Sequence, residues 1–381
     1  MKATKYRIKP NNEQQQKLAV QFGCARFVYN DALAKKIEAY QKDKTVLSVY
    51  DLQKMLPKMK SAEETCWLKD AYAQVLQSSL RNLDVAFKNF FSKRARFPKF
   101  KKKNGKQSIQ YPQGVTIEGG TIKLPKVGKV KIVLSREVIG KIKTVTISKD
   151  SVGHYYASVL MDDGVIPPEP VKSVESSIGI DMGIHDFVTT STGEKVANLR
   201  FLKRSLRNLK RKQQSLARKK KGSKRREKAK LLVAKVHKQV ANARNDFHHK
   251  LSFTLANENQ VVCVEDLNIR GMTKNRKLAR HIQDIGWHGF TTKLKYKLVD
   301  RGGTLVKIDR MFPSSKTCSF CGFKREVLPL SVRQWNCTNC EAHIDRDFNA
   351  AVNIHRQGIL KLQAEGTTVS ARGGERKSSH G

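Results

Sequence analysis

The sequence predicts an α+β protein of several domains, in which a small antiparallel β-barrel with an inserted helical lobe is followed by an α/β domain with a cysteine-rich insertion. Three observations support this fold class. Apolar residues recur at helical spacing over residues 11–95 and at strand-like, alternating spacing over residues 96–170. Beyond residue 170, strand and helix patterns follow one another, and two CxxC pairs interrupt them. The 381 residues have room for two or three domains.

Short alternating segments predict the barrel. Apolar and basic residues alternate over residues 5–9, which indicates a strand. Four more alternating segments, separated by glycines, cover residues 115–117, 121–124, 130–133 and 145–147. Since several short strands at this spacing are typical of small antiparallel barrels, we expect residues 1–10 and 96–170 to form one barrel that the first strand completes.

Two apolar stripes predict the helical lobe. Turn and cap residues at Pro10 to Glu13 precede a stripe that runs from Gln14 to about Lys42. A second stripe over residues 71–94 repeats its apolar side chains at steps of three and four. The helical lobe is therefore expected to occupy residues 11–95, between the first strand and the rest of the barrel.

The second half of the chain mixes strands and helices. A proline-rich stretch at residues 167–170 separates it from the barrel. Residues 177–190 predict a buried strand, a glycine turn and a second strand, and a third strand is expected at residues 195–197. The apolar stripe of residues 199–258 predicts two long helices that are joined near Gly222.

These patterns divide the second half into an interrupted domain, an insertion and a tail. The expected ranges are 171–312 and 344–361 for the α/β domain, 313–343 for the cysteine-rich insertion and 362–381 for the tail. Because the tail is rich in Gly, Ser and Thr and has few apolar residues, we expect it to be disordered.

The charge of the chain indicates a polyanionic partner. With 75 Lys and Arg against 33 Asp and Glu, the net charge is +42, and such a chain repels itself unless a polyanion neutralises it. Nucleic acid is favoured over a membrane, because no stretch approaches the roughly 18 to 20 apolar residues of a spanning helix. The basic start lacks the apolar segment of a signal peptide, so secretion is not expected.

The positive charge is concentrated in one segment. Residues 200–250 hold 20 Lys or Arg and only two acids, Glu227 and Asp246, for a local net charge of +18. A solvated helical face is the plainer interpretation of such a run. The charge exceeds what solubility needs, so contact with phosphates is favoured.

Four of the seven cysteines have the spacing of a zinc site. Cys318 and Cys321 form the first CxxC pair, and Cys337 and Cys340 form the second after 15 intervening residues. This spacing predicts a zinc ribbon with four thiolates, and a closed site of this kind is structural rather than catalytic. Redox use of either pair is the alternative.

The other three cysteines stand in mainly apolar surroundings. Cys24, Cys66 and Cys263 are each predicted to be small core residues. The pairs His248–His249 and Ser314–Ser315 show no context of a catalytic triad, so we assign them no nucleophilic role.

Three acidic residues stand where an apolar strand ends or a helix begins. Asp181 follows Ile178 to Ile180, Glu265 follows Val261 to Val264, and Asp347 precedes a helical pattern. A buried carboxylate needs a partner, and a pair of Mg²⁺ ions held by carboxylates serves phosphodiester hydrolysis. A capped strand end or a salt bridge is the alternative for any one of these acids.

An ordered set of motifs resembles the TnpB family, which bacterial insertion sequences encode and which is similar to type V CRISPR effector nucleases. The resemblance covers nearly the whole chain. Its motifs here are Tyr6-Arg-Ile-Lys-Pro10, Phe97-Pro-Lys-Phe-Lys101, Gly179-Ile-Asp-Met-Gly183, Val264-Glu-Asp-Leu-Asn268, Pro313-Ser-Ser-Lys-Thr-Cys-Ser319 and Asp345-Arg-Asp-Phe-Asn-Ala-Ala351.

The resemblance implies identities for the predicted domains. The barrel corresponds to a wedge domain, the helical lobe to a recognition lobe, and the interrupted α/β domain to an RNase H-like RuvC nuclease. The zinc ribbon corresponds to an insertion that binds target nucleic acid. Residues 270–287 correspond to a lid beside the active site, although a surface loop with a short helix is an equally good interpretation of this segment.

The resemblance also implies the catalytic residues. The RuvC acids fall on Asp181, Glu265 and Asp347, which would hold two Mg²⁺ ions. Asp345 is the alternative for the third position, because spacing alone does not choose between the two acids of Asp345-Arg-Asp347. Asp347 is preferred, because its place before the helix should direct its side chain toward the strands.

The predicted function is that of an RNA-guided, Mg²⁺-dependent DNA endonuclease of an insertion sequence. The expected partners are a guide (omega) RNA and double-stranded target DNA, which is cut beside a short transposon-associated motif. We expect a monomeric protein within the ribonucleoprotein, in the cytoplasm and on the nucleoid when bound to DNA. The alternatives are a transcriptional repressor that binds without cutting and an RNase H-like transposase.

Overall fold

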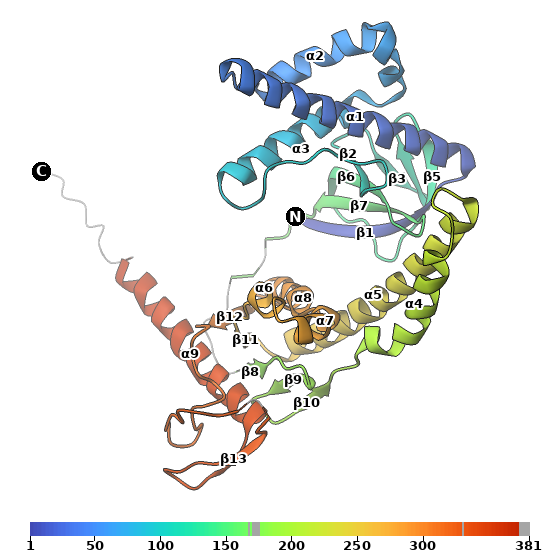
Figure 1. The fold of residues 1–381 in the computed structure, drawn as a ribbon. Coiled ribbons are helices and arrows are strands. Elements are labelled where there is room, and N and C mark those ends of the chain that lie inside the picture. The colour runs from blue at the N-terminus through green and yellow to red at the C-terminus, as the bar shows by residue number, and fades with distance from the viewer. Residues whose placement is uncertain (167, 170–175, 330, 373–381) are drawn as a thin grey trace, which may run out of the picture. The chain divides into compact units, whose positions relative to one another are not determined.

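The computed structural model describes the chain in two compact units. The described residues are 1–166, 168–169, 176–329 and 331–372, with side chains up to residue 365. The units are Met1–Val165 and Ile166–Gly381, and each contains a sheet with helices (Figure 1). Among the described residues, no helix combines the length and the apolar composition that a membrane span requires.

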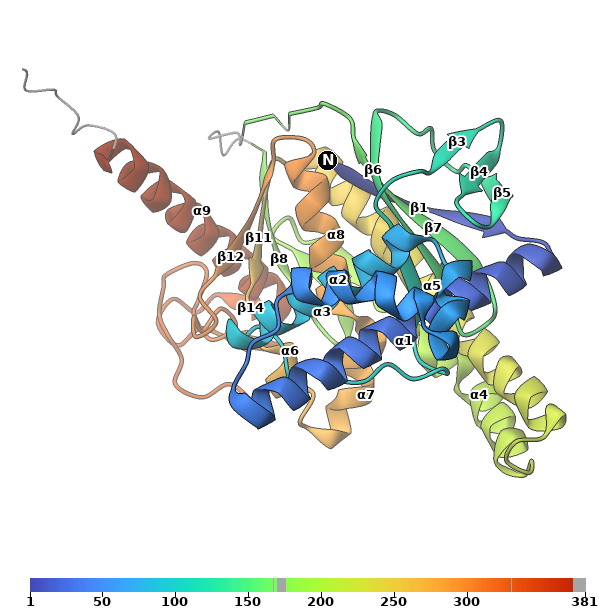
Figure 2. The ribbon, with the colours of Figure 1, turned by 90° about the horizontal axis from the view of Figure 1, so that it is seen from above.

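The first unit is built on a curled antiparallel sheet of seven strands (Figure 2). The strands are β1 (Lys2–Lys9), β2 (Gln107–Tyr111), β3 (Thr116–Glu118), β4 (Thr121–Leu124), β5 (Gly128–Val133), β6 (Lys141–Lys149) and β7 (Tyr155–Asp162). Their order is β2-β6-β7-β1-β5-β4-β3. The first strand of the chain therefore lies in the middle, where it pairs with β5 and β7 and joins the two halves of the sheet.

Helices fill the long connection between β1 and β2. They are α1 (Asn12–Asp43), α2 (Val49–Ser61), the 3-10 helix η1 (Glu63–Asp70) and α3 (Ala73–Phe91). The side chains of Asn11 and Gln14 bond to each other's backbone N–H groups, so a capping box starts α1 where the sequence predicts it. The segments α2 and η1 are not predicted from the sequence. Their few buried residues (Leu52, Leu56 and Leu68) gain stability from tertiary packing, which a short pattern does not reveal.

Two cores stabilise this unit. In the first, Leu18 and Phe22 of α1 pack with Tyr6 of β1 and Tyr111 of β2, so that α1 covers one face of the sheet. In the second, buried residues of α1, α2, η1 and α3 pack on one another. The helical segments therefore have a core of their own and also contribute to the core of the sheet.

The second unit contains a mixed sheet of five strands in the order β10-β9-β8-β11-β12. The strands are β8 (Ser177–Asp181), β9 (Asp186–Thr190), β10 (Lys195–Ala197), β11 (Val261–Glu265) and β12 (Thr304–Ile308). The strands β8, β11 and β12 are parallel, whereas β9 and β10 continue the sheet antiparallel. The strands β8, β9 and β10 have the positions that the sequence predicts.

In the described part of the second unit, six helices and a small two-stranded sheet accompany the mixed sheet. They are α4 (Phe201–Ala217), α5 (Lys224–Glu258), α6 (Ile269–Met272), α7 (Arg276–Ile285), α8 (Trp287–Val299), α9 (Arg346–Arg372), β13 (Gln334–Asn336) and β14 (His343–Asp345). The predicted break between the two long helices is confirmed at residues 218–223. The side chain of Ser223 accepts a hydrogen bond from the backbone N–H of Arg226 and so caps α5.

Helices cover both faces of the mixed sheet. Val262 and Val264 of β11 belong to the core that α5, α7 and α8 share, whereas Val261 and Cys263 belong to the core beneath α9. Gly179 allows α9 to lie directly on β8, since a Cβ there would come within 2.3 Å of the backbone oxygen of Ala351. The helix α9 thus brings its first turn to the strand ends.

Two expectations need correction. Helix α9 continues to Arg372, so residues 362–372, which we expected to be disordered, are helical. Adding residues to a helix that is already packed costs far less than starting a new one. Residues 373–381 of the predicted tail lie outside the described residues. Cys24 and Cys263 are buried as predicted, but Cys66 is exposed.

Candidate functional site

Asp181 and Glu265 stand at the same end of the mixed sheet. Asp181 is the last residue of β8, and Glu265 is the last residue of β11. The two strands are parallel, with Ile180 opposite Val264, so the residues that follow these two lie side by side. Asp347, in the first turn of α9, approaches from the helix that packs on β8.

The electrostatic environment of Asp181 reflects this arrangement. Its burial, followed by the negative charges of Glu265 and Asp347, raises the pKa of Asp181 to about 7. The positive charges of Arg346 and Arg333 oppose this shift. The three predicted acids are therefore close enough to influence one another.

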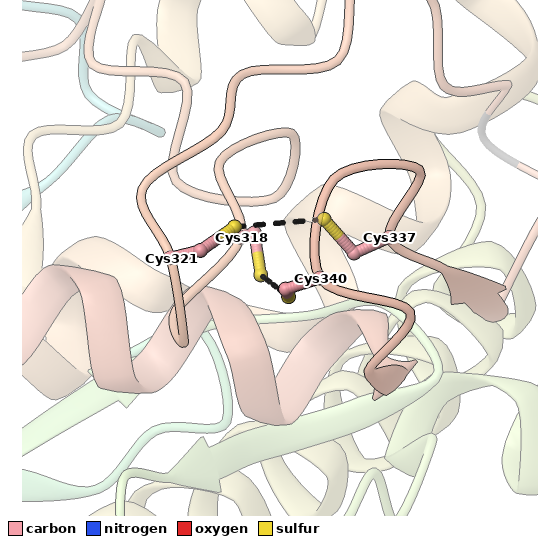
Figure 3. A group of neighbouring side chains, drawn as sticks. All are labelled: Cys318, Cys321, Cys337 and Cys340. Atoms are coloured by element: carbon pink, nitrogen blue, oxygen red, sulfur yellow. Dashed lines mark hydrogen bonds between the residues drawn. The ribbon is translucent and has the colours of Figure 1, made fainter.

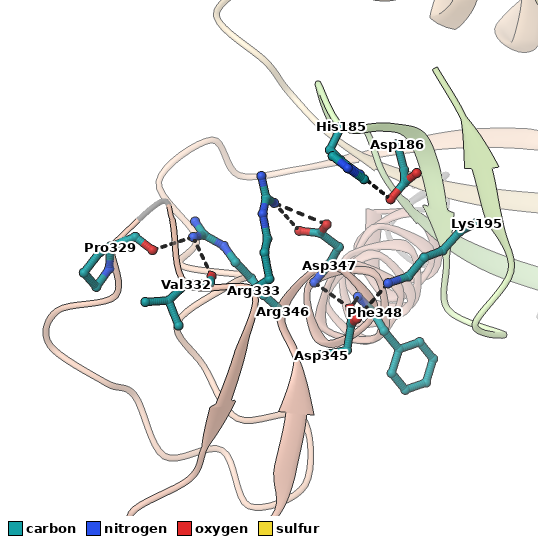
Figure 4. Close-up of polar contacts among 10 residues, drawn as sticks. All are labelled: His185, Asp186, Lys195, Pro329, Val332, Arg333, Asp345, Arg346, Asp347 and Phe348. Atoms are coloured by element: carbon teal, nitrogen blue, oxygen red, sulfur yellow. Dashed lines mark hydrogen bonds and ion pairs between the residues drawn. The ribbon is translucent and has the colours of Figure 1, made fainter. Parts of the chain in front are cut away.

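Asp345, the alternative third acid, caps α9 (Figure 4). Its Oδ1 accepts hydrogen bonds from the backbone N–H groups of Asp347 (3.1 Å) and Phe348 (3.0 Å), as an N-cap residue does. Its Oδ2 lies 2.7 Å from the Nζ of Lys195. Burial alone would raise the pKa of Asp345, but the hydrogen bond from Lys195 and those from the backbone lower it. Both carboxylate oxygens are thus engaged in structural contacts.

Two further side chains contact the acids, and no sequence pattern predicts either of them to be part of the site. The Nη1 atom of Arg333 donates to both carboxylate oxygens of Asp347, at 3.2 and 3.3 Å (Figure 4). The Oγ of Ser314 donates a hydrogen bond to the Oε1 of Glu265. Arg333 is one of 75 basic residues. The only feature of the sequence that distinguishes it is its position between the two CxxC pairs, and this position does not indicate a contact with Asp347.

The donor chemistry of the three acids fits a divalent cation. Carboxylate oxygens are the ligands that Mg²⁺ prefers, and the burial of Asp181 together with the mutual repulsion favours a positive counter-charge. In the structure Asp347 is turned toward Arg333. Among the described residues, only the four cysteines bring three or more potential ligand atoms within 4.8 Å of one another. Cation binding would therefore require the three carboxylates to come closer together than they are in this structure.

Replacing Asp181 by Asn should stabilise the protein when no divalent cation is present. The change removes one of three mutually repelling charges at nearly constant volume, which we expect to raise the free energy of unfolding by about 1 kcal/mol. Adding Mg²⁺ should raise the melting temperature of the unchanged protein more than that of Asp181→Asn. Thermal unfolding with and without Mg²⁺ measures both effects.

Asp266 offers a control next to Glu265. Its carboxylate pairs with Lys307 and Arg310, and the hydrogen bonds from these two residues lower the pKa of Asp266. We expect the Asp266→Asn variant to be stabilised by Mg²⁺ as much as the unchanged protein is. Without Mg²⁺, its melting temperature should not exceed that of the unchanged protein. If Asp181→Asn were destabilising and responded to Mg²⁺ fully, the acids would not form a cation site.

The four cysteines of the predicted ribbon meet at one point (Figure 3). The Sγ atoms of Cys318 and Cys340 are 3.7 Å apart, as are those of Cys321 and Cys337. A tetrahedral zinc ion with Zn–S bonds of about 2.3 Å has sulfur atoms about 3.8 Å apart. The four thiols are therefore spaced to bind a zinc ion, as the CxxC spacing predicts.

Buried asparagines attach this ribbon to α9. The Nδ2 atoms of Asn349 and Asn353 donate to the backbone oxygen of Thr317, at 2.8 and 2.6 Å. The Oδ1 of Asn349 accepts a hydrogen bond from the backbone N–H of Ser319 at 2.8 Å. The same helix thus carries Asp347 and holds the segment that contains the first CxxC pair.

The basic segment forms the exposed faces of α4 and α5. Of the 20 Lys and Arg residues between positions 200 and 250, 15 are exposed. The apolar stripe is buried only in part, at Leu209, Val236 and Val240 among others. The helices therefore present a large cationic surface to the solvent.

The expected lid consists of short helices fastened to the long ones. The carboxylate of Asp284 accepts hydrogen bonds from the backbone N–H groups of Leu202 and Lys203 at the start of α4. The Nη1 of Arg244 donates to the backbone oxygens of Gln283 and Asp284. The C-terminal end of α7 is thus held to α4 and α5.

His248 is a core residue. It is buried beside Phe187, Phe247 and Phe290, and its Nε2 lies 2.9 Å from the backbone oxygen of Ile285. Burial lowers the pKa of His248 to about 4, so this side chain is neutral at physiological pH.

The fold and the site define a class of nucleic-acid-associated proteins. Residues 157–276 match the OrfB_IS605 family, described as a probable transposase, and residues 287–354 match the Cas12f1-like TNB domain. Residues 1–45 match a helix-turn-helix domain of OrfB proteins, and in the structure they contain β1 and the single helix α1. A Cas12f1 chain solved with guide RNA and target DNA shares the fold, with a TM-score of 0.56 and 15% identity over 90% of this chain and 82% of that chain.

Close relatives place the chain within this class. A protein from Streptomyces pristinaespiralis, described as a putative RNA-guided DNA endonuclease, is 40% identical over 94% of this chain and 89% of its own length. The protein InsQ of Escherichia coli K12, with the same description, is 32% identical over 98% and 96%. The chain therefore belongs to the TnpB family, which confirms the resemblance of its motifs.

Proposed function

We propose that this protein is an RNA-guided DNA endonuclease of an insertion sequence. The observation that carries the proposal is the meeting of Asp181, Glu265 and Asp347 at the ends of two parallel strands and a helix. Two relatives with the same described activity, similar over nearly the full length, support it. The reaction would be Mg²⁺-dependent hydrolysis of phosphodiester bonds in double-stranded DNA beside a short transposon-associated motif.

The domains take corresponding roles in this proposal. Residues 1–10 and 96–170 would be the wedge and residues 11–95 the recognition lobe. Residues 171–312 and 344–361 would be the RuvC nuclease, with residues 270–287 as its lid. Residues 313–343 would be the zinc-binding insertion that contacts target nucleic acid. The division is supported by the curled sheet, by the separate helical core and by the mixed sheet with its acids.

The side chains of the site would divide the work of the reaction. Asp181, Glu265 and Asp347 would hold two Mg²⁺ ions, which supply a nucleophilic water and stabilise the leaving oxygen. Ser314 would orient the carboxylate of Glu265 through its hydrogen bond. Arg333, once released from Asp347, would place a guanidinium group where a phosphate can accept its hydrogen bonds.

The cationic surface of α4 and α5 would bind nucleic-acid backbone. A chain with a net charge of +42 gains affinity for polyanions through the release of counterions. We assign this surface to the guide RNA and the target DNA, bound by one copy of the chain. The ribonucleoprotein would act in the cytoplasm and on the nucleoid.

The test of this function is the redirection of cutting by RNA. Expressed with the DNA that follows its coding sequence, the protein should purify with one dominant RNA that has a defined 3′ guide segment. Replacing only that segment should move Mg²⁺-dependent double-strand breaks to a matching site beside a fixed motif. Sequencing of the bound RNA and of the cut ends measures both. Cutting that ignores the replacement would refute the proposal.

A second candidate function comes from the description of the matching family as a probable transposase. A transposase with the same acids would join the ends of the element to target DNA rather than leave free ends. The cutting assay separates the two, because strand transfer gives joined products. Defined RNA without any cutting of a matched target would instead identify a repressor.

A further inference from the structure

Residues 87–103 of the first unit combine aromatic and basic side chains in a way that the proposed nuclease site does not use. These 17 residues contain five Phe, eight Lys or Arg and no acid. They begin in the last turns of α3 and continue along the chain that follows it toward β2 (Figure 1). We refer to residues 87–103 as the aromatic strip.

Three aromatic rings of the strip are strongly exposed. Phe91 is 74% exposed, Phe100 is 52% exposed and Phe97 is 44% exposed. An exposed aromatic ring contributes little hydrophobic stabilisation to the folded protein, and groups of such rings are typical of binding sites. The strip therefore presents apolar surface for which folding gives no reason.

Contacts among the rings hold the strip in a defined arrangement. The centroid of the Phe97 ring lies 5.5 Å from that of Phe87 and 5.3 Å from that of Phe90, in edge-to-face geometry. The centroids of Phe90 and Phe91 are 5.3 Å apart. Phe97 thus returns to the end of α3 and supports the rings that α3 presents.

The backbone of the strip is fixed at both ends. After α3, Lys93 adopts a left-handed conformation with φ of 57°, and the backbone oxygen of Asn89 accepts hydrogen bonds from Arg94 and Ala95. Farther along, the side chain of Asn30 bonds to both the N–H and the oxygen of Lys101, at 2.8 and 3.0 Å. The exposed rings therefore stand on an ordered support.

The basic residues continue into a cationic pocket. A pocket of about 200 Å³ adjoins the end of the strip, and Lys101 and Lys102 line it together with Arg26 and Lys106. Cationic side chains beside exposed aromatic rings are the combination that binds single strands, in which bases stack on rings and phosphates contact the charges. A duplex fits less well, because its paired bases expose their faces only at the ends.

We propose that the aromatic strip is a binding site for unpaired nucleotides of a nucleic-acid strand. Phe91 and Phe100 stack on bases, and the Lys and Arg side chains with the adjoining pocket bind the phosphates. The site lies in the first unit and needs no cutting, so its failure and the failure of the nuclease proposal are separate results.

The test uses the full-length protein and 15-nucleotide single strands without Mg²⁺. Phe91→Ala combined with Phe100→Ala should weaken single-strand binding by at least about 25-fold, because each lost stacked base represents roughly 5- to 150-fold in affinity. Binding of a duplex of equal length should change less than about twofold. Anisotropy at moderately high salt measures both, and the exposed rings can be removed without unfolding the chain.

Matched variants make the result specific. Tyr40→Ala removes another exposed ring of the same unit, 54% exposed in α1, and should change neither affinity. Phe91→Trp should retain single-strand binding, because the larger ring still stacks. Arg94→Ala with Arg96→Ala should weaken single-strand and duplex binding alike, since these side chains contact phosphates rather than bases.

Photocrosslinking identifies the strand and the site. Strands that carry 5-iodouracil, as DNA and as RNA, should crosslink to peptides within residues 87–103. The variant with Phe91→Ala and Phe100→Ala should lose these crosslinks. Loss with the DNA strand, the RNA strand or both supports the proposal and identifies the type of strand that binds. Equal loss of single-strand and duplex binding on removing the rings would overturn it. Binding of the strip to anionic phosphatidylglycerol vesicles, with single-strand binding unchanged, would overturn it as well.

Discussion

Replacing Asp181 or Asp347 by Asn, or Glu265 by Gln, should abolish DNA cutting while RNA and DNA binding are largely kept. Each change removes one negatively charged ligand from the proposed cation site at nearly constant volume. Binding rests on many dispersed Lys and Arg contacts, so it should respond little. The loss of cutting should exceed the roughly 10- to 100-fold that is typical of residues that merely orient a metal ligand. Cutting of a matched target by the purified ribonucleoprotein measures the effect.

Asp345→Asn is the matched control for Asp347→Asn. Asparagine caps a helix about as well as aspartate, so this variant should keep the start of α9 and lose only the ion pair with Lys195. An exposed ion pair contributes at most about 1 kcal/mol, and cutting should remain close to normal.

The opposite result would exchange the two roles. Full cutting by Asp347→Asn with none by Asp345→Asn would transfer the third ligand position to Asp345. Cutting that survives the changes at Asp181, Glu265 and Asp347 would end the assignment of the nuclease site. Loss of RNA binding by these variants would point instead to a structural role for the acids.

Replacing Cys318 and Cys321 by Ser should remove one zinc ion per chain and disorder the ribbon. Thiolate binding to zinc stabilises the folded ribbon directly, and its core is small, with Trp335 packed beside Leu328 and Ile344. The fluorescence of Trp335, which is 5% exposed, should shift to longer wavelength as the ribbon opens. Metal analysis and tryptophan fluorescence measure the two effects.

The remaining cysteines provide controls for the zinc prediction. Cys66→Ser changes an exposed thiol that belongs to neither CxxC pair and should leave zinc content and fluorescence unchanged. Trp335→Phe should remove the spectral shift and so assign it to the ribbon. Freshly purified, reduced protein without zinc would refute the prediction. Because α9 carries both Asp347 and the asparagines that hold Thr317, disorder in the ribbon should also reduce cutting.

Periodicity predicted the long elements because their burial repeats regularly along the chain. The helix α1 and the pair α4 and α5 could be predicted from apolar stripes, and the cluster of four cysteines could be predicted from the spacing of Cys318 to Cys340. The short helices α2 and η1 could not be predicted from the sequence pattern. They are stable because other helices cover their few apolar residues.

The sequence by itself determined the class of elements, the cluster of four cysteines and the family, since each depends on residue type and local spacing. Only the tertiary structure shows that Asp345 caps α9 and that Asp347 lies near Asp181, because the first depends on where the helix begins and the second on how α9 crosses β8 at Gly179. The pairing of Arg333 with Asp347 likewise requires the folded ribbon to lie against α9. Contacts between residues far apart in the chain are set by packing, and no local pattern encodes them.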